Sequence, residues 1–131
     1  MQIIHSALLD YVTTQAQEST RLRMNYNFHE GASSPSQRLL NALEPGTELP
    51  VHRHRHTAET YILLRGRLRV IFYNDARLVV DSTILDPLKG QFGVNIPAGQ
   101  WHTVEALEPQ TTIFEAKDGP YGSLGEEDVL R

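Results

Sequence analysis

Three histidines alternate along one short segment of the chain. His52, His54 and His56 lie two residues apart, and Glu59 follows three residues after the last of them. Imidazole is the commonest metal ligand among side chains. In an extended strand, residues two apart point to the same face, so His52 and His54 can direct two nitrogens at one point. Crowded imidazoles repel one another when protonated, whereas a shared metal ion binds the neutral rings. The segment therefore predicts a site for one metal ion.

The composition narrows the kind of site. The chain has 131 residues, which fits one domain, and 40% of them are apolar, enough for a hydrophobic core. It contains no cysteine, so thiol and disulfide chemistry is excluded, and metal ligands must come from His, Asp, Glu or water. The net charge of −4 argues against a nucleic-acid partner.

The chain shows no pattern that would place it in a membrane. No stretch approaches the roughly 20 apolar residues that a membrane helix needs. The first ten residues also lack the basic and then apolar order of a signal peptide. We therefore expect a cytoplasmic protein without a membrane partner.

The elements that must position these histidines are mostly strands. Residues 3–17 carry apolar side chains at helical spacing, namely Ile4, Leu8, Tyr11 and Val12. After about residue 22, short strand-like segments recur at intervals of about 8–12 residues with Gly and Pro turns between them, which is typical of an all-β sandwich or barrel. The expected strands are 23–28, 37–43, 60–64, 68–73, 77–85, 92–96, 102–107 and 111–117.

Two further expectations concern the ends of this pattern. The last two strands read as a hairpin around Glu108 and Pro109. The chain divides into an N-terminal helical segment (1–21), a barrel (22–121) and an acidic C-terminal tail (122–131), which we expect to be loosely held.

The spacing around the histidines resembles the first motif of the cupin superfamily. That motif, Gly-x5-His-x-His-x4-Glu-x6-Gly, is met by Gly46, His52, His54, Glu59 and Gly66. A second, looser cupin motif is a glycine followed by Pro-x-Gly-x-x-His, and here Gly90 precedes a match at 97–102 that ends at His102. One position departs from the family, because Ala106 stands where an asparagine often follows that histidine.

The resemblance implies a fold and a ligand set. Cupins are small antiparallel jelly-roll barrels that hold a metal inside, through two histidines and a glutamate of the first motif and the histidine of the second. Carried over, the implied ligands are His52, His54, Glu59 and His102, which leave two positions of an octahedral ion open. The pair His54 and His56 is the alternative start of the motif. The family spacing to Glu59 disfavours it and leaves His56 to orient a ligand, contact substrate or face solvent.

A narrower resemblance covers roughly residues 21–121. The segments 21–29, 37–46, 52–60 and 114–121 are similar to the WbuC family of cupin-fold metalloproteins, which is associated with bacterial surface-polysaccharide gene clusters. Single-domain cupins are commonly homodimers, so the resemblance also implies a homodimer. An edge strand from the 20–45 region would pair across it.

The leading functional hypothesis is a metal-dependent enzyme that acts on a small polar molecule such as a sugar derivative. The ligand set suits an isomerase or epimerase, with the metal as a Lewis acid, and equally a dioxygenase. Mixed nitrogen and oxygen ligation admits Mn, Fe, Ni or Zn. A non-catalytic protein that binds a small ligand through its metal, or serves as an accessory subunit, is the alternative. A metal-free structural cupin is the third hypothesis.

Other residues are candidates for the pocket around the metal. His56 and Tyr61 are the catalytic candidates, since either side chain could move a proton near the ligands. Asn25, Asn27 and His29 share one face of the expected 23–29 strand and are candidates for binding substrate hydroxyl or carboxylate groups. A second pair, Glu115 and Lys117, shares a face of the last strand, and we expect it to contribute little, as opposite-charge surface pairs usually do.

Overall fold

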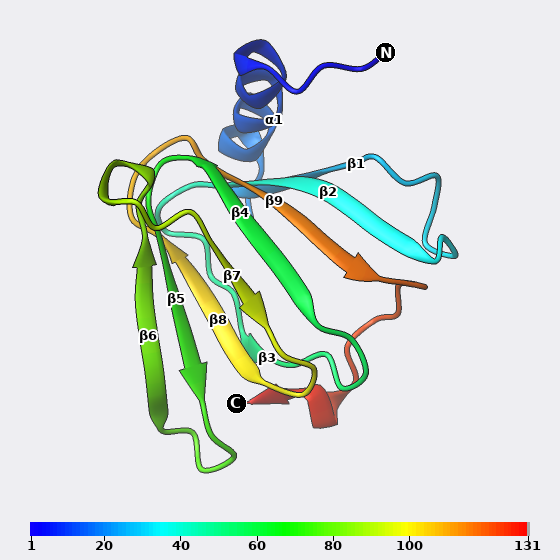
Figure 1. The fold of residues 1–131 in the computed structure, drawn as a ribbon, viewed down its shortest axis with the longest axis vertical. Helices are drawn as coiled ribbons and strands as arrows, with labels where there is room; N and C mark the ends of the chain where they lie inside the picture. Colours follow the sequence, from blue (N-terminus) through cyan, green and yellow to red (C-terminus); the bar gives the residue numbers. More distant parts are fainter. Residues whose placement is uncertain (131) are drawn as a thin grey trace.

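A single helix precedes ten short strands in the structure, a computed structural model that describes residues 1–130 (Figure 1). The helix is α1 (Ser6–Glu18). The strands are β1 (Arg23–Asn27), β2 (Ser36–Leu43), β3 (Val51–His52), β4 (Glu59–Arg65), β5 (Leu68–Tyr73), β6 (Val79–Leu85), β7 (Gly93–Ile96), β8 (Trp101–Ala106), β9 (Thr111–Asp118) and β10 (Val129–Leu130). Two short 3-10 helices, Pro87–Lys89 and Glu126–Asp128, complete the elements.

The strands form two five-stranded antiparallel sheets. One sheet has the order β1-β2-β9-β4-β7, and the other has the order β10-β3-β8-β5-β6. The main core lies between them, because alternate side chains of each strand point inward. Its largest fully buried members are Leu43, Leu68, Leu85, Ile96 and Ile113. The mostly-β architecture with one N-terminal helix confirms the predicted fold class.

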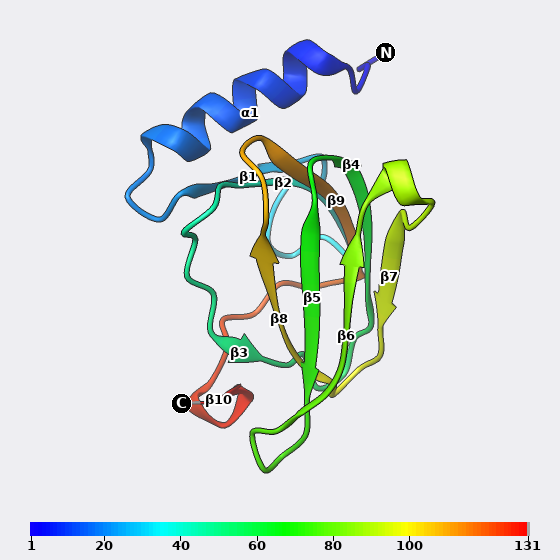
Figure 2. The same cartoon turned by 90° about the vertical axis from the view of Figure 1, so that its left-hand side faces the viewer.

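Helix α1 covers the outer face of the first sheet over β1, β2 and β9 (Figure 2). Its buried side chains fall at helical spacing and pack against Leu40 and Ala42 of β2. They are Leu9, Val12, Thr13 and Ala16. Ile4 and Tyr11, which we expected on this face, are about half exposed, because the helix begins only at Ser6 and its buried stripe starts with Leu9. Within residues 1–130, no helix has the length and apolar character to cross a membrane.

The expected hairpin around Glu108 and Pro109 is wrong. Strand β8 pairs with β3 and β5, whereas β9 pairs with β2 and β4, so the connection passes from one sheet to the other. Two strands joined by a short turn usually pair with each other as a hairpin. Here β8 and β9 belong to different sheets, which cover opposite sides of one core. The connection therefore crosses the end of the barrel.

The end of the described chain is also attached more firmly than expected. Strand β10 pairs with β3, where Val129 lies opposite His52. The carboxylate of Asp128 accepts hydrogen bonds from Arg53 at 3.0 Å and from Arg55 at 2.6 Å. Hydrogen bonds between these charged side chains thus hold the C-terminal segment against the barrel. Its acidic composition alone had suggested a loosely held tail.

Candidate metal centre

Three histidine side chains converge between the two sheets. His52 on β3 lies directly opposite His102 on β8, and His54 follows two residues after His52. One ring nitrogen of each lies within 4.8 Å of the other two. His102 is 1% exposed, while His52 and His54 are partly buried. This group of nitrogens can bind a metal ion.

Backbone carbonyls orient two of the three rings. Nδ1 of His52 lies 3.0 Å from the carbonyl oxygen of Pro50, and Nδ1 of His102 lies 2.9 Å from that of Gln100. When Nδ1–H donates to a carbonyl, Nε2 carries the free lone pair. Nε2 of His102 is buried and has no hydrogen-bond partner among residues 1–130. Buried polar atoms normally have partners, and a metal ion would satisfy this one, so the residues fit a metal.

Burial keeps these imidazoles neutral. Burial, and then the neighbouring His102, lowers the pKa of His52 to about 4. Burial likewise lowers the pKa of His102, against the opposing effects of its carbonyl partner and of Glu59. Neutral rings are the form that a metal ion requires, so the site is prepared for metal binding at neutral pH.

Glu59, at the start of β4, brings a negative charge to the histidines. Its carboxylate is 3% exposed, contacts Nε2 of His54, and accepts a hydrogen bond from the Tyr61 hydroxyl at 2.5 Å. Nε2 of His102 lies 3.9 Å away, and Nζ of Lys117 lies 3.8 Å away. Burial opposes ionisation of this carboxyl, but the hydrogen bond and charge of His54, the hydrogen bond from Tyr61 and the charge of Lys117 together lower its pKa to about 2. The structure therefore brings all four predicted ligands together, with the glutamate ionised.

A cleft of about 280 Å³ leads to the histidines. Tyr61 lies at its base, where burial raises the pKa of the phenol well above its ordinary value. The cleft is near the lower limit of the roughly 300–1,000 Å³ that small-molecule sites occupy. Away from the ligands it is lined mainly by polar and charged side chains, among them Arg21, Arg23, Asn25, Glu115, Lys117 and Tyr121. A site of this size and polarity suits a small hydrophilic molecule.

The three candidate substrate residues divide between two adjoining hollows; Asn25 and Asn27 belong to β1, and His29 follows after its end. Asn25 lines the cleft itself. Asn27 and His29 line a neighbouring hollow of about 230 Å³, which shares Asn25 and Lys117 with the cleft. Nδ1 of His29 accepts a hydrogen bond from the Arg38 backbone N–H at 3.0 Å, so one of its nitrogens is already engaged. The β1 face thus extends the cleft away from the metal ligands.

His56 lies apart from the other histidines. It is exposed in the loop between β3 and β4. With His54, Arg55 and Asp128 it lines another hollow against the C-terminal segment, and this hollow shares His54 with the cleft. The structure therefore does not place His56 in the cleft with the predicted ligands.

Glu115 and Lys117 are the cleft residues that the sequence led us to undervalue. Strand β9 lies beside β4 with Lys117 opposite Glu59 and Glu115 opposite Tyr61. Asn41 donates a hydrogen bond to Glu115 at 2.9 Å. Burial and then the charge of Glu59 raise the pKa of Glu115 to about 7. Their shared face was visible in the sequence, but the pairing of β9 with β4 was not.

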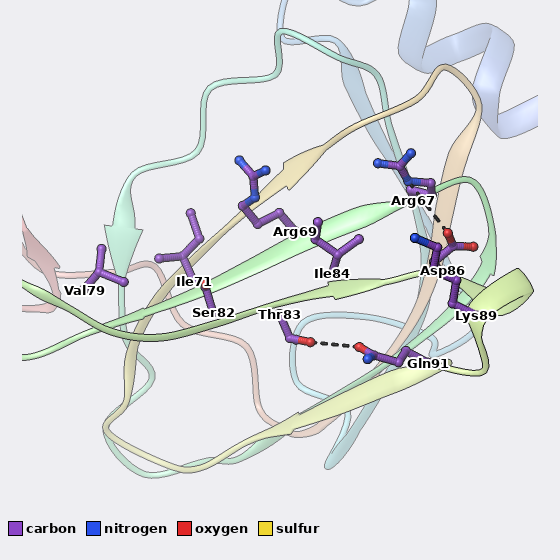
Figure 3. A pocket seen from close by; sticks show the side chains of 10 residues that line it. All are labelled: Arg67, Arg69, Ile71, Val79, Ser82, Thr83, Ile84, Asp86, Lys89 and Gln91. Atoms are coloured by element: carbon purple, nitrogen blue, oxygen red, sulfur yellow. Dashed lines mark hydrogen bonds and ion pairs between the residues drawn. The ribbon is translucent and has the colours of Figure 1, made fainter.

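A wider hollow of about 680 Å³ lies outside the β5–β6 pair (Figure 3). Two of its basic side chains are close to carboxylates. Arg69 contacts Glu105 at 3.1 Å, and Arg67 lies 3.9 Å from Asp86. The lining contains no histidine. Among the described residues, this hollow therefore offers no cluster of metal ligands, in contrast to the cleft.

Comparisons with known proteins support the fold. The family described as "Domain of unknown function (DUF6016)" matches residues 4–85. Among solved structures, the chain resembles the cupin domain of Schizosaccharomyces pombe Cnp3 (TM-score 0.58, 11% identity, 73% of this chain and 64% of that chain). It also resembles the capsular polysaccharide assembling protein CapF of Staphylococcus aureus (0.64, 16%, 86% and 30%). A third similar structure is the oxalate decarboxylase of Lactobacillus farciminis (0.58, 16%, 77% and 30%).

These matches identify the barrel as a cupin-type jelly roll. The chain spans less than two thirds of each of these three structures, and its identity to them is low, so the similarity concerns the fold. No curated protein sequence matches the chain.

Proposed function

The chain belongs to the DUF6016 family, and from this premise and the site's geometry we propose that it is a metal-dependent cupin enzyme acting on a small polar molecule. One observation carries the proposal. Three ring nitrogens lie within 4.8 Å of one another at the base of a polar cleft, and one of them is buried without a partner. Similarity to the enzyme oxalate decarboxylase supports a catalytic role for this fold.

His52, His54, Glu59 and His102 would hold the ion. Three neutral imidazoles and one carboxylate suit Mn, Fe, Ni or Zn, all in the divalent state. Such an ion supplies Lewis-acid polarisation of a bound oxygen group or, if it is redox-active, electron-transfer chemistry. The protein's own contribution is to keep the rings of His52 and His102 neutral and the Glu59 carboxylate ionised before the ion arrives.

Glu115 is the side chain best suited to move a proton in the cleft. Its pKa of about 7 allows it both to donate and to accept at neutral pH. Of the earlier catalytic candidates, Tyr61 already donates a hydrogen bond from its hydroxyl group to Glu59. The raised pKa of this phenol also disfavours its deprotonation. His56 lies outside the cleft. We therefore assign proton transfer to Glu115 rather than to either of them.

The substrate class follows from the lining of the cleft. Amides and charged groups recognise hydroxyl and carboxylate groups, which suits a sugar derivative. Asn25 would contact it in the cleft, and Asn27 and His29 would do so in the adjoining hollow. The similarity to CapF, a capsular polysaccharide assembling protein, supports a place in surface-polysaccharide metabolism and agrees with the WbuC resemblance. The predicted homodimer would use the free edge of β1, the last strand of its sheet.

The test combines two readouts on the metal-loaded protein. A panel of aldoses, ketoses and uronic acids in D₂O is followed by NMR for deuterium incorporation next to the carbonyl, which reports isomerase or epimerase chemistry. An oxygen electrode on the same panel reports dioxygenase chemistry. We expect one of these activities, lost in His102→Ala and retained in His56→Ala. Activity that survives in His102→Ala contradicts the metal-dependent mechanism.

The alternative function is a non-catalytic protein that binds a small ligand through its metal. The polar lining of the cleft favours this alternative, because it would bind a ligand whether or not Glu115 transfers a proton. Saturable binding of a panel member, without deuterium incorporation or oxygen uptake, would select this alternative over the enzyme.

A further inference from the structure

Two arginines line the metal cleft without a carboxylate partner. Arg21 and Arg23 belong to the lining, and neither lies within 4.0 Å of a carboxylate oxygen among residues 1–130. By contrast, Arg53, Arg55, Arg65, Arg67 and Arg69 each have such a partner. Two neighbouring cations at one cleft, in a chain of net charge −4, call for an anion that the described residues do not supply.

The local backbone holds this pair in place. Leu22, between the two arginines, has a left-handed φ of +56°, a conformation that is uncommon for a residue with a branched side chain. Its carbonyl oxygen accepts hydrogen bonds from the Glu44 N–H at 2.9 Å and the Thr47 hydroxyl at 2.6 Å. The turn between α1 and β1 is therefore tied to the β2–β3 connection, which runs beside it (Figure 2). A fixed turn presents both arginines at the cleft.

Arg23 keeps most of its hydrogen-bonding capacity for a ligand. Its Nη1 donates a hydrogen bond to the Glu48 carbonyl oxygen at 2.9 Å, which orients the guanidinium. The other N–H groups of the guanidinium remain available to a ligand. Burial and the charge of Arg21 both lower the pKa of Arg23, as expected where two cations are close together. A guanidinium pair of this kind matches the oxygens of a carboxylate or a phosphate.

We propose that Arg21 and Arg23 form an anion-binding subsite of the cleft, which selects substrates that carry a carboxylate or phosphate group. The inference rests on the proposed function, because the subsite belongs to the same cleft. It narrows the substrate class from a small polar molecule to an anionic one. Arg21 and Arg23 are binding residues in this account, and the chemistry stays with the histidines and the carboxyl groups.

The test uses three hexoses that differ only at carbon 6. They are D-glucose, which is neutral, D-glucuronate, which carries a carboxylate, and D-glucose 6-phosphate. Each is titrated by calorimetry into full-length protein loaded with one equivalent of Zn²⁺, in 150 mM salt. The NMR signals of the arginine side-chain N–H groups are followed in parallel. The better of the two charged hexoses identifies the anion as carboxylate or phosphate.

We expect one charged hexose to bind at least about tenfold more tightly than glucose, which is the effect of one charged hydrogen-bonded contact. It should shift the signals of Arg21 and Arg23. The double variant Arg21→Gln/Arg23→Gln should reduce its affinity to that of glucose. Arg38→Gln is the matched control, because Arg38 is exposed and lies outside the cleft. It should retain the full preference.

The inference is overturned if neither charged hexose binds, if all three hexoses bind equally, or if the preference survives the double variant. The metal content of the same samples separates this result from the proposed function. A protein that holds one equivalent of Zn²⁺ but shows no charge preference disproves the subsite alone. If the protein takes up none of Mn²⁺, Fe²⁺, Ni²⁺ and Zn²⁺, the metal proposal fails, and the titrations of the metal-free protein decide the subsite by themselves.

Discussion

At the scale of single residues, the site is defined by protonation states. His52 has a pKa of about 4 in the folded protein against an ordinary value of 6.5. The unfolded chain therefore binds a proton more readily, and the contribution of His52 to the free energy of unfolding of the metal-free protein should fall as the pH drops from 6.5 through 4. The contribution of His52 is at most about 3 kcal/mol.

Urea unfolding in the presence of EDTA, at several pH values between 7.5 and 4, measures this loss. The stability of the wild type relative to His52→Gln should fall as the pH drops, whereas His56→Gln should follow the wild-type profile, because His56 is exposed. A difference between wild type and His52→Gln that stays constant over this pH range would show that His52 is not held neutral by burial.

Glu115 predicts the opposite pH dependence. Its pKa is about 7 in the folded protein against 4.5, so the unfolded chain loses the proton first. The contribution of Glu115 to the free energy of unfolding should therefore fall as the pH rises from 4.5 through 7. Glutamine resembles the protonated acid, so Glu115→Gln should be about 1–3 kcal/mol more stable than wild type at pH 8 and similar at pH 5.

Denaturant unfolding of the metal-free proteins at these two pH values checks this prediction. Glu105→Gln is the control, because Glu105 is exposed and pairs with Arg69 outside the barrel. A Glu115→Gln protein that is less stable than wild type at pH 8 would mean that the carboxylate, not the acid, is the stabilised form.

At the scale of elements, two glycines of the motifs serve the fold in different ways. Gly66, between β4 and β5, has a φ of +87°, and an added Cβ would lie 2.7 Å from the Thr111 Cα. Gly99, before β8, has a φ of +82° with no atom within 4 Å of an added Cβ. Alanine at Gly99 should therefore cost only the backbone strain of about 1 kcal/mol, and alanine at Gly66 should cost several times as much.

Thermal or urea unfolding of Gly66→Ala and Gly99→Ala separates steric overlap from backbone strain. The two substitutions impose similar backbone angles, so each controls for the other. Equal losses in the two variants would show that the contact with Thr111 relaxes, and that Gly66 is required only for its turn.

The elements also show where sequence reasoning reached its limit. Most strands lie within two residues of their predicted bounds, because alternation and Gly/Pro turns are local properties. The partner of each strand is not local, and this explains both the wrong hairpin between β8 and β9 and the undervalued pair Glu115 and Lys117. The four predicted metal ligands could be grouped only because the two family motifs link residues that are far apart in the sequence. The periodicity of apolar residues carries no information about such distant pairs.

At the scale of the whole molecule, the candidate metal centre joins the two sheets. His52 and His102 belong to one sheet, and Glu59 begins a strand of the other. An ion bound to all of them would therefore connect both layers, and binding would be linked to global stability. At a free metal concentration 100 times the dissociation constant, the gain is about 2.7 kcal/mol, or roughly 5–10 °C in Tm for a chain of this length.

Thermal unfolding with and without one added metal at pH 7.5 measures this coupling. The shift should shrink at pH 4, where protons compete for the imidazole of His52, whose pKa is about 4, and it should be absent in His102→Ala. An equal shift in His102→Ala would place the stabilising ion elsewhere on the protein.

Metal content tests the central claim most directly. The protein is purified without an affinity tag, stripped with chelator, reconstituted with Mn²⁺, Fe²⁺, Ni²⁺ or Zn²⁺, and assayed by elemental analysis. We predict about one equivalent of at least one of these ions in the wild type and in His56→Ala, and almost none in His102→Ala. Less than about a tenth of an equivalent in the wild type, with no uptake on reconstitution, would contradict the account.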